Sequence, residues 1–530
     1  MKPKFLCAIL LMLTGARLFS APSNVIFSDY PDVDIIRVEN TYYMVSTTMH
    51  FFPGCPILRS YNLKNWEIAS YVYDELDGTS GQKLENGKGI YGQGMWAASL
   101  RYNRGKFYIS FVANDTHKTY LYTADNVEGP WKKSQISGFY HDMSLLFDDD
   151  GKVYVVSGNT NINITEMKAD LSGPEAGGLN QTVIKDDRAK VILGYEGAHA
   201  YKINGKYYIF LINWPKGKYR TEAVYVSDKI EGPYTGRDIL NADFNNWHSG
   251  VAQGGIVDSP DGKWYSILFQ DHGAMGRMPL LVEAEFGPDG FPFYKLDEKY
   301  VFVPLNLRTD PTDLNPGYEY ESLYCSGFSG KDGKLHKAWQ WNHQPDVNGY
   351  KFKLAAGNTS KEQYTITTTN VVQNLTMAKN TLTQRAFTEH CVATVEVDGA
   401  RMKDGDIAGL CALEGDYGFI GITKRGKKYF VIEAEREGDS VNQHIAAEAP
   451  VKDGKIQLKA MFTLTSSNQT AVFSYLDKTS GSYKKLGNSK KLRFTLDHFS
   501  GVRFGLFCFS TKQAGGQAIF SNFQYGILPL

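Results

Sequence analysis

The chain has 530 residues, which is enough for two domains that each bury their own core. Its 57 Lys and Arg residues balance 57 Asp and Glu residues, and this excludes a global charge that would attract nucleic acid or an anionic membrane. Aromatic residues make up 13% of the chain and 52 glycines interrupt it, a composition typical of an all-β protein with many turns.

The first twenty residues differ from the rest of the chain. Lys2 and Lys4 precede an apolar run over residues 5–13, and small residues follow as far as Ser20 and Ala21. This pattern predicts a secretory signal peptide over residues 1–20, because the run is too short to span a membrane. We therefore expect an exported protein, periplasmic or secreted. No later segment approaches the roughly 18 apolar residues that a membrane helix needs, so we expect no membrane span.

A tight turn followed by a short aromatic strand recurs five times between residues 22 and 308. Successive turns are separated by roughly 46 to 65 positions, the spacing of four-stranded propeller blades with variable loops. The repeat therefore predicts a five-bladed β-propeller over residues 22–308. The five units are Asn40-Thr41-Tyr42-Tyr43, Gly105-Lys106-Phe107-Tyr108, Gly151-Lys152-Val153-Tyr154, Gly205-Lys206-Tyr207-Tyr208 and Gly262-Lys263-Trp264-Tyr265.

One residue stands nine or ten positions before the turn of each unit. In a propeller the innermost strand of each blade runs along the central axis, so residues at one offset should lie at one level of the central funnel. Three of the five are acids, which predicts a ring with an acidic centre; the alternative is that hairpins place polar residues at strand starts by chance. The five residues are Asp32, Trp96, Asp142, Glu196 and Gln253.

Residues 309–320 combine prolines, glycine and aspartates without an apolar period, and they predict a linker. Beyond it the blade pattern is lost, but short alternating strands continue near residues 392–397, 417–423, 429–433, 471–475, 502–509 and 518–525. We expect a second domain, a β-sandwich, over residues 321–530. The predicted fold class is therefore all-β, a five-bladed β-propeller followed by a β-sandwich.

Three acids on three walls of one funnel are suited to cleaving a glycosidic bond. That reaction needs a carboxylic acid that protonates the leaving oxygen and a carboxylate that activates water on the other face of the sugar. A third carboxylate nearby can raise the pKa of the acid by like-charge repulsion. Neutral sugars also agree with the balanced charge of the chain.

Several stretches of the sequence, in order over nearly all of residues 25–305, resemble family 43 glycoside hydrolases. Residues 339–343, 381–385 and 408–410 resemble the C-terminal sandwich of the exo-acting pentosidases of that family. The first-domain stretches are Pro31-Asp32, Phe52-Pro53-Gly54-Cys55-Pro56-Ile57, Met95-Trp96-Ala97-Ala98-Ser99, residues 142–151, Glu196-Gly197 with His199, Gln253-Gly254-Gly255, Phe269-Gln270-Asp271-His272-Gly273 and Gly276-Arg277.

The resemblance implies a role for each acid. Asp32 would be the general base, Glu196 the general acid, and Asp142 the residue that raises the pKa of Glu196 and orients it. Family members invert the anomeric configuration, which implies room for a water between base and sugar. Among the other residues, Arg277 would bind substrate hydroxyls, and Trp96 with Phe51 or Phe52 would wall the sugar, although blade packing is favoured for Phe52.

The fifth blade departs from the family pattern. Many members carry a histidine just before the Gln-Gly-Gly stretch, near a central cation or water cluster, whereas this chain has Ala252. Either His248 or His272 could take the central role, and we count His272 and Gln253 among the substrate-binding candidates. We predict no metal in the chemistry and no required cofactor; a structural calcium ion is left unassigned, and Asp148-Asp149-Asp150 is interpreted as a solvated hairpin.

We expect an inverting exo-glycosidase that releases non-reducing terminal α-L-arabinofuranose, and also β-D-xylose, from oligosaccharides of plant hemicellulose or pectin. A β-D-xylosidase that acts on xylo-oligosaccharides is the first alternative. A non-catalytic glycan-binding protein is the alternative from another class, but binding alone does not require the Asp, Asp and Glu set. An endo-acting arabinanase would need a groove open on both sides, and the appended sandwich disfavours it.

Overall fold

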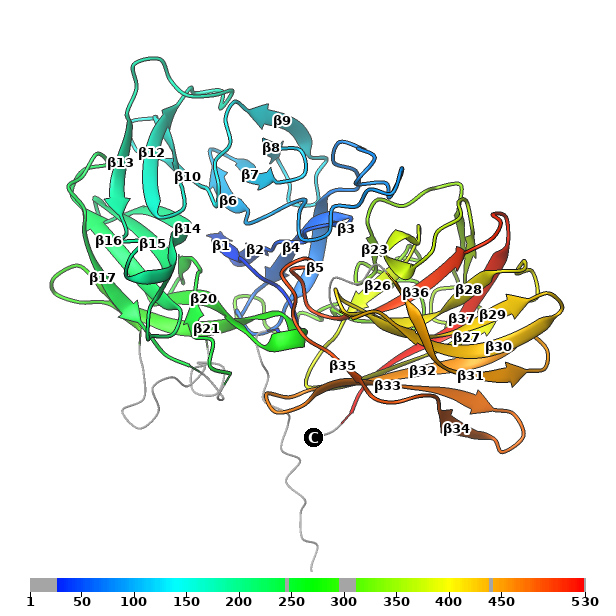
Figure 1. Ribbon diagram of the computed structural model, residues 1–530. Coiled ribbons are helices and arrows are strands. Elements are labelled where there is room, and N and C mark those ends of the chain that lie inside the picture. The colour runs from blue at the N-terminus through cyan, green and yellow to red at the C-terminus, as the bar shows by residue number, and fades with distance from the viewer. Residues whose placement is uncertain (1–25, 244–246, 295–310, 438–441, 529–530) are drawn as a thin grey trace, which may run out of the picture.

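The computed structural model describes residues 26–243, 247–294, 311–437 and 442–528 of the chain. The predicted signal peptide and residues 309–310 of the predicted linker lie outside these ranges. Within them, no helix is long and apolar enough to span a membrane. Regular structure there is almost entirely β-strand, arranged in two bodies side by side (Figure 1), with short 3₁₀ turns at Gly273–Met275 (η1), Thr359–Lys361 (η3) and Leu375–Met377 (η4).

The first body is a five-bladed propeller, as predicted. Each blade is an antiparallel sheet whose strands follow one another in chain order, except that β19 pairs with β20 beside β18. Blades one and two contain β1 (Asp34–Val38), β2 (Thr41–Val45), β4 (Gly54–Ser60), β5 (Glu67–Tyr73), and β6 (Ser99–Asn103), β7 (Lys106–Ala113), β8 (Lys118–Ala124), β9 (Lys132–Ile136). Blades three and four contain β10 (Ser144–Phe147), β11 (Val153–Ser157), β12 (Asn161–Met167), β13 (Asn180–Lys185), and β14 (Val191–Ile203), β15 (Lys206–Pro215), β16 (Thr221–Ser227), β17 (Thr235–Leu240). Blade five contains β18 (Val251–Ala252), β19 (Ile256–Asp258), β20 (Trp264–Asp271), β21 (Arg277–Phe286) and β22 (Pro292–Tyr294).

Two of the recurrent turns show why the repeat was visible in the sequence. Asn103 pairs with Lys106 across a two-residue turn, in which Arg104 and Gly105 have φ angles of 50° and 81°. The β14–β15 turn repeats this geometry at residues 204–205, with φ angles of 50° and 78°. A type I′ turn needs positive φ at both central residues and matches the twist of the flanking strands. The glycine of the repeated unit therefore has a definite conformational cause.

The inner strands of neighbouring blades lie beside one another and define the axis of the ring. Strand β1 contacts β6, β6 contacts β10, β10 contacts β14, and β19 contacts β1. Residues that precede these strands are therefore brought together at one end of the axis. This arrangement positions the candidate site.

The second body is a β-sandwich, which confirms the other half of the predicted fold. One sheet has the order β3-β23-β26-β36-β28-β29-β30-β31 and the other the order β24-β25-β37-β27-β32-β33-β34, with β35 paired to β33. The first contains β3 (Phe51–Phe52), β23 (Gln340–Asn342), β26 (Leu382–Arg385), β36 (Arg503–Ser510), β28 (Asp406–Leu413), β29 (Gly418–Arg425), β30 (Lys428–Glu435) and β31 (His444–Val451). The second contains β24 (Tyr350–Lys353), β25 (Gln363–Thr367), β37 (Gln517–Ile527), β27 (His390–Asp398), β32 (Lys455–Leu464), β33 (Gln469–Asp477), β34 (Ser482–Lys485) and β35 (Lys490–Lys491).

The two bodies are joined by backbone pairing as well as by side chains. Strand β3 leaves the first blade and pairs with β23, so that Phe52 faces Trp341 at the edge of a sandwich sheet (Figure 1). Near η1, the Val502 N–H donates to the Ala274 carbonyl at 2.8 Å. The Gln469 side chain bonds the same turn, because it accepts from the Ala274 N–H at 2.9 Å. The sandwich therefore fixes a turn of the fifth blade.

Candidate active site

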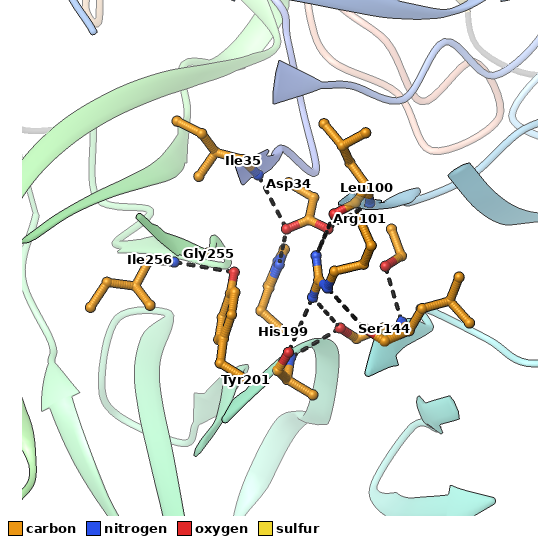
Figure 2. A network of polar contacts seen from close by, with 12 residues as sticks. Asp34, Ile35, Leu100, Arg101, Ser144, His199, Tyr201, Gly255 and Ile256 are labelled. Atoms are coloured by element: carbon orange, nitrogen blue, oxygen red, sulfur yellow. Dashed lines mark hydrogen bonds and ion pairs between the residues drawn. The ribbon is translucent and has the colours of Figure 1, made fainter. Parts of the chain in front are cut away.

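A buried ion pair links the inner strands of four blades. Asp34 Oδ2, at the start of β1, accepts hydrogen bonds from Arg101 Nη1 at 2.6 Å and from the Leu100 N–H at 2.8 Å. The Arg101 side chain on β6 also donates to Ser144 Oγ at 2.6 Å, and His199 Nδ1 on β14 lies 3.1 Å from Asp34 Oδ1 (Figure 2). These contacts fix the relative positions of four inner strands.

The same network answers the question that the sequence left open about a central histidine. Burial raises the pKa of the Asp34 carboxyl, but Arg101 and His199 outweigh burial and hold this pKa below its ordinary value. The central histidine is thus His199, and neither His248 nor His272 belongs to the network drawn in Figure 2. Blade five approaches through Gly255, where a Cβ would overlap the hydroxyl of Tyr201.

Residues predicted to be equivalent in different blades share an unusual backbone conformation. Asp32 and Asp142 each lie two residues before an inner strand and have φ angles of 52° and 47°, and Gln253 in blade five has a φ of 60°. Left-handed φ costs a non-glycine residue about 1–2 kcal/mol, so its recurrence indicates a common structural constraint. In blade four Glu196 lies within β14 between two register shifts, and it is Gly197 that has the positive φ, 63°.

Asp142 and Glu196 lie close together, with His141 beside both. His141 Nε2 is 3.5 Å from Asp142 Oδ2 and 3.5 Å from Glu196 Oε2. Burial raises the pKa of Asp142 to about 7; His141 and the Gly197 N–H lower it, whereas Glu196 and Asp32 raise it. Burial lowers the pKa of His141, but the carboxylates outweigh burial and raise it to about 9. The group therefore combines a protonatable carboxyl with a cationic imidazole at neutral pH.

Asp32 is paired with an arginine of the fifth blade. Arg277 Nη1 donates to Asp32 Oδ1 at 2.6 Å, and both side chains are buried. Burial raises the pKa of Asp32, while Arg277 and the Thr47 hydroxyl partly offset that rise and Glu196 adds to it. A buried carboxylate that keeps an arginine partner can remain ionised and accept a proton.

An aromatic residue of the second body lies over this group. Phe499 stacks on Trp96 with ring centroids 5.7 Å apart, and the guanidinium of Arg277 lies 4.7 Å from the Phe499 centroid. On its other side Trp96 meets His141 edge to face at 5.8 Å. Trp96 and Arg277 were predicted to contact substrate, and the structure places Trp96 against His141 and Arg277 on Asp32.

The sequence hypothesis for Phe51 needs correction. Its ring is fully buried between the two bodies, with the Arg503 guanidinium 3.4 Å from its centroid and the tilted ring of His50 at 4.3 Å. A ring enclosed in this way cannot also face a sugar, so Phe51 packs the interface. Phe52 is buried in the first blade against Tyr73, in agreement with the packing role favoured for it.

Gln253 and His272 occupy different surroundings. The Gln253 side chain packs where a Cβ on Gly197 would lie, so it adjoins the residue after Glu196. The main-chain N–H of Gln253 donates to Glu222 Oε2 at 2.7 Å. His272 is buried, stacks on Trp247 at 4.2 Å and contacts a neighbouring glutamine side chain of β20, and burial lowers its pKa to about 3. Among the described residues, the hydrogen-bond neighbour of the His272 ring is Gln270 and not one of the three carboxylates.

Sequence reasoning missed three residues that reach this group. His141 directly precedes Asp142 in the chain, and this position is the one signal in the sequence that could have suggested a role. Asn159, in the β11–β12 turn, donates a close hydrogen bond from Nδ2 to Glu196 Oε2, and Asn159 Oδ1 accepts from Arg188 at 3.0 Å. Neither Asn159 nor Phe499 belongs to a repeated unit, so no spacing could have marked them.

One group of side chains in the described ranges has the spacing of a metal site. The candidate ligand atoms of His141, Asp142 and Glu196 all lie within 4.8 Å of one another. A cation held there would compete with the proton that a general acid must carry. The Asp148 carboxylate, by contrast, is bonded to Lys202 and Tyr207 in a blade turn.

Comparisons with known proteins match both bodies. Residues 22–292 match the family model described as glycosyl hydrolases family 43, and residues 327–526 match the one described as the beta xylosidase C-terminal concanavalin A-like domain. A protein of Formosa agariphila named beta-xylosidase is 27% identical over 94% of this chain and 89% of its own length. A non-reducing end alpha-L-arabinofuranosidase of Bacteroides ovatus is 26% identical over 56% of this chain and 60% of its own length.

A solved structure shows the same arrangement of the two bodies. It is described as a bifunctional GH43-CE protein of Bacteroides eggerthii, and it superposes with a TM-score of 0.85 and 38% sequence identity over 96% of this chain. This chain covers 64% of that longer chain. The likeness therefore extends over both the propeller and the sandwich of this chain.

Proposed function

This chain belongs to glycosyl hydrolases family 43, and from that membership we propose an exo-acting glycosidase that removes a terminal pentose from plant hemicellulose or pectin oligosaccharides. The proposed first substrate is a non-reducing terminal α-L-arabinofuranoside, and the second is a β-D-xyloside. The carrying observation is the convergence of Asp32, Asp142 and Glu196 beneath Phe499 of the second domain. A wall from another domain on one side of the carboxylates favours an exo-acting enzyme.

The proposed mechanism assigns different proton states to the carboxyls. Glu196 gives a proton to the leaving oxygen, and Asp32 takes a proton from the water that attacks the anomeric carbon. Polar side-chain atoms of Glu196, Asp142 and His141 all lie within 4.8 Å of one another, and Asp32 is not part of this group. This separation supports inversion, which needs space for a water between base and sugar.

Unpaired donors support the proposed sugar contacts. In the described ranges, Arg277 Nε and Nη2 and Trp96 Nε1 are buried without a hydrogen-bond partner. A buried donor without a partner costs about 1–3 kcal/mol, and sugar hydroxyls would supply the missing acceptors. We propose that Arg277 uses one nitrogen to orient Asp32 and the others to hold the pentose.

The β-xylosidase function is the second candidate, because the Formosa agariphila relative that matches 94% of this chain carries that name. Release of nitrophenol from the aryl α-L-arabinofuranoside and from the aryl β-D-xyloside distinguishes the two. A panel of arabinosylated and xylosylated oligosaccharides, with the released sugar identified, then fixes the linkage. Activity on neither aryl substrate nor oligosaccharide, with glycan binding retained, would favour the glycan-binding alternative.

Stereochemistry tests the mechanism separately from the substrate. Proton NMR of the first sugar released should show the anomer opposite to that of the substrate. Retention of configuration would contradict the assignment of Asp32 as a base that acts through water.

We further propose that the chemistry needs no metal and that the protein is exported. The positive charge of Arg101 already satisfies Asp34 at the propeller axis, which supports activity without a central cation. Dialysis against a chelator should leave kcat/KM unchanged, and restoration of lost activity by calcium would overturn the proposal. Fractionation of cells, with the N-terminus of the mature protein sequenced, tests export and cleavage near residue 20.

A further inference from the structure

Asp29 is a buried carboxylate that the proposed mechanism does not use. Its Oδ1 accepts a hydrogen bond from the Arg277 N–H at 2.8 Å, and its Oδ2 accepts one from the Gly501 N–H at 2.9 Å. The first donor belongs to the fifth blade and the second to the sandwich. One side chain of the first blade therefore ties two distant segments together.

Each of these segments presents a group to the candidate site. Arg277 places its guanidinium on Asp32 at 2.6 Å. Gly501 ends the short loop that carries Phe499, whose ring lies 4.7 Å from the Arg277 guanidinium and 5.7 Å from the Trp96 ring. A shift of Asp29 would therefore displace the partner of the proposed base and the aromatic wall together.

The packing around Asp29 leaves no room for a side chain on either glycine beside it. A Cβ on Gly276, whose φ is 94°, would overlap Asp29 Oδ1. A Cβ on Gly501 would overlap the Met275 carbonyl and come within 2.9 Å of Asp29 Cβ. In both segments it is thus the main chain that lies against the Asp29 carboxylate. Short hydrogen bonds from main-chain N–H groups to a carboxylate require this close approach.

The charge of Asp29 also acts on the proposed base. Charged groups that influence Asp32 are Arg277, Asp29, Glu196, Asp142 and His141. Of these, Arg277 lowers the pKa of Asp32, whereas Asp29 and Glu196 raise it. Arg277 has a larger effect than Asp29, so a variant of Asp29 that displaces Arg277 should raise the pKa of Asp32.

We propose that Asp29 is a positioning residue that holds the Arg277 guanidinium and the Phe499 ring in register over one bound pentose. This inference rests on the proposed glycosidase function. Asp29 touches neither substrate nor reacting atoms, and it acts through the backbones of Arg277 and Gly501.

The test is the Asp29→Asn variant, which keeps the size of the side chain but retains only one acceptor oxygen and no charge. We expect KM for the aryl pentoside to rise and kcat/KM to fall by about 10- to 100-fold, since displacement of catalytic groups by about 1 Å costs this much. We also expect the acidic limb of the kcat/KM profile to move to higher pH, because the displaced Arg277 lowers the pKa of Asp32 more than Asp29 raises it. Assays run well below the Tm of each variant.

Asp406→Asn is the matched control. Asp406 is another buried aspartate that accepts a backbone N–H, from Lys403 at 2.6 Å, but it lies in β28 of the sandwich. A purely structural loss should lower its Tm while leaving KM and the acidic limb as in the wild type. If Asp29→Asn behaves like Asp406→Asn, the positioning role is wrong.

If Asp29→Asn does not fold, hydrogen exchange of the wild-type protein tests the role of Asp29 instead. Hydrogen exchange should then show the amides of Arg277 and Gly501 protected together, and rapid exchange of either would overturn the inference. Failure of the proposed function has a different signature, because the wild type itself would then release no pentose. An active wild type with an unchanged Asp29→Asn profile rejects only the role of Asp29.

Discussion

His141 and Asp142 are adjacent in the chain, yet both face Glu196. An imidazole whose pKa is raised to about 9 lies 3.5 Å from both carboxyls, so the repulsion between them is partly neutralised. The proposed acid, Glu196, therefore has three polar neighbours, Asp142, His141 and Asn159, and not one carboxylate alone. The individual residues lead to two predictions.

Glu196→Gln should lower turnover on arabinosylated or xylosylated oligosaccharides by about 10²- to 10⁴-fold, because no proton reaches the leaving oxygen. The loss on nitrophenyl substrates should be smaller, since nitrophenolate leaves without a proton. Steady-state kinetics on both substrate types measure the difference. The control is Glu175→Gln, a change of an exposed residue on the loop between β12 and β13. Equal losses on both substrate types would contradict the acid role.

Asp32→Asn should abolish activity on both substrate types to within the detection limit, because attack by water needs a base whatever the leaving group. The asparagine can still accept from Arg277, so the fold should be retained, as circular dichroism would show. Appreciable residual turnover on the aryl substrate would exclude Asp32 as the base.

The three acids could be predicted from the sequence because each stands at a fixed offset from a turn that is itself readable. Asp32 and Asp142 share the same left-handed backbone, so the offset reflects one conformation repeated in different blades. Asn159 and Phe499 lie in irregular loops, and their contacts with Glu196 and Trp96 depend on packing between distant segments. Phe51 was misassigned because the local sequence does not distinguish a phenylalanine that lines a sugar site from one that is buried between two domains.

At the scale of elements, the loop before β36 is the part of the sandwich that matters to the candidate site. Phe499 adopts a φ of 56° there, and the Phe499 N–H donates to the Thr495 carbonyl at 2.8 Å. The same loop meets the propeller at Gly92, where a Cβ would lie 2.8 Å from the Asp497 carbonyl. The loop is thus held by the propeller as well as by its own domain.

Phe499→Ala should raise KM for the aryl pentoside by about 10-fold, because an aromatic contact contributes roughly 0.5–1.5 kcal/mol beyond its buried area. Leu496→Ala is the control on the same loop, since Leu496 is 77% exposed. Initial rates over a range of substrate concentrations separate KM from kcat. An unchanged KM in Phe499→Ala would remove Phe499 from the sugar site.

Some strands could be predicted from the sequence and others could not, and the difference has physical causes. Four of the five turn-and-strand units were visible because positive φ favours glycine at their turns, and blade packing selects aromatics after them. In the first unit the positive φ belongs to Glu39, at 54°, and not to Asn40. The six predicted strands of the second domain correspond to β27, β29, β30, β33, β36 and β37. Strand β3 could not be predicted, because two residues carry no period and its partner β23 is almost 300 positions away.

For the molecule as a whole, the contact between domains contains a cluster of neutral histidines. The rings of His50 and Tyr91 of the propeller lie against those of His343 and His498 of the sandwich, at centroid distances of 4.5–5.5 Å. Burial lowers the pKa of His343 and of His498 to about 3, and that of His50 well below its ordinary value. The domains thus meet through groups that resist protonation.

Acid should therefore separate or unfold the domains. An unfolded histidine binds a proton below about pH 6.5 and these folded ones do so only near pH 3, so stability falls as pH drops through that window. Each histidine contributes up to about 1.4 kcal/mol per pH unit. Tm measured from pH 7 to pH 4 should fall less steeply in His498→Asn, while the exposed His117→Gln should match the wild type. Equal slopes in all three would contradict this account.

The dependence of the candidate site on Phe499 has a consequence for the timing of synthesis. Asp32 and Phe499 are separated by 467 positions, and translation at about 5–20 residues per second places roughly 25 to 90 s between them. During that interval the propeller can fold and bring its three acids together. Phe499 and the Gly501 N–H that bonds Asp29 have not yet been synthesised. The nascent chain is therefore expected to bind pentosides weakly until nearly all of it has been made.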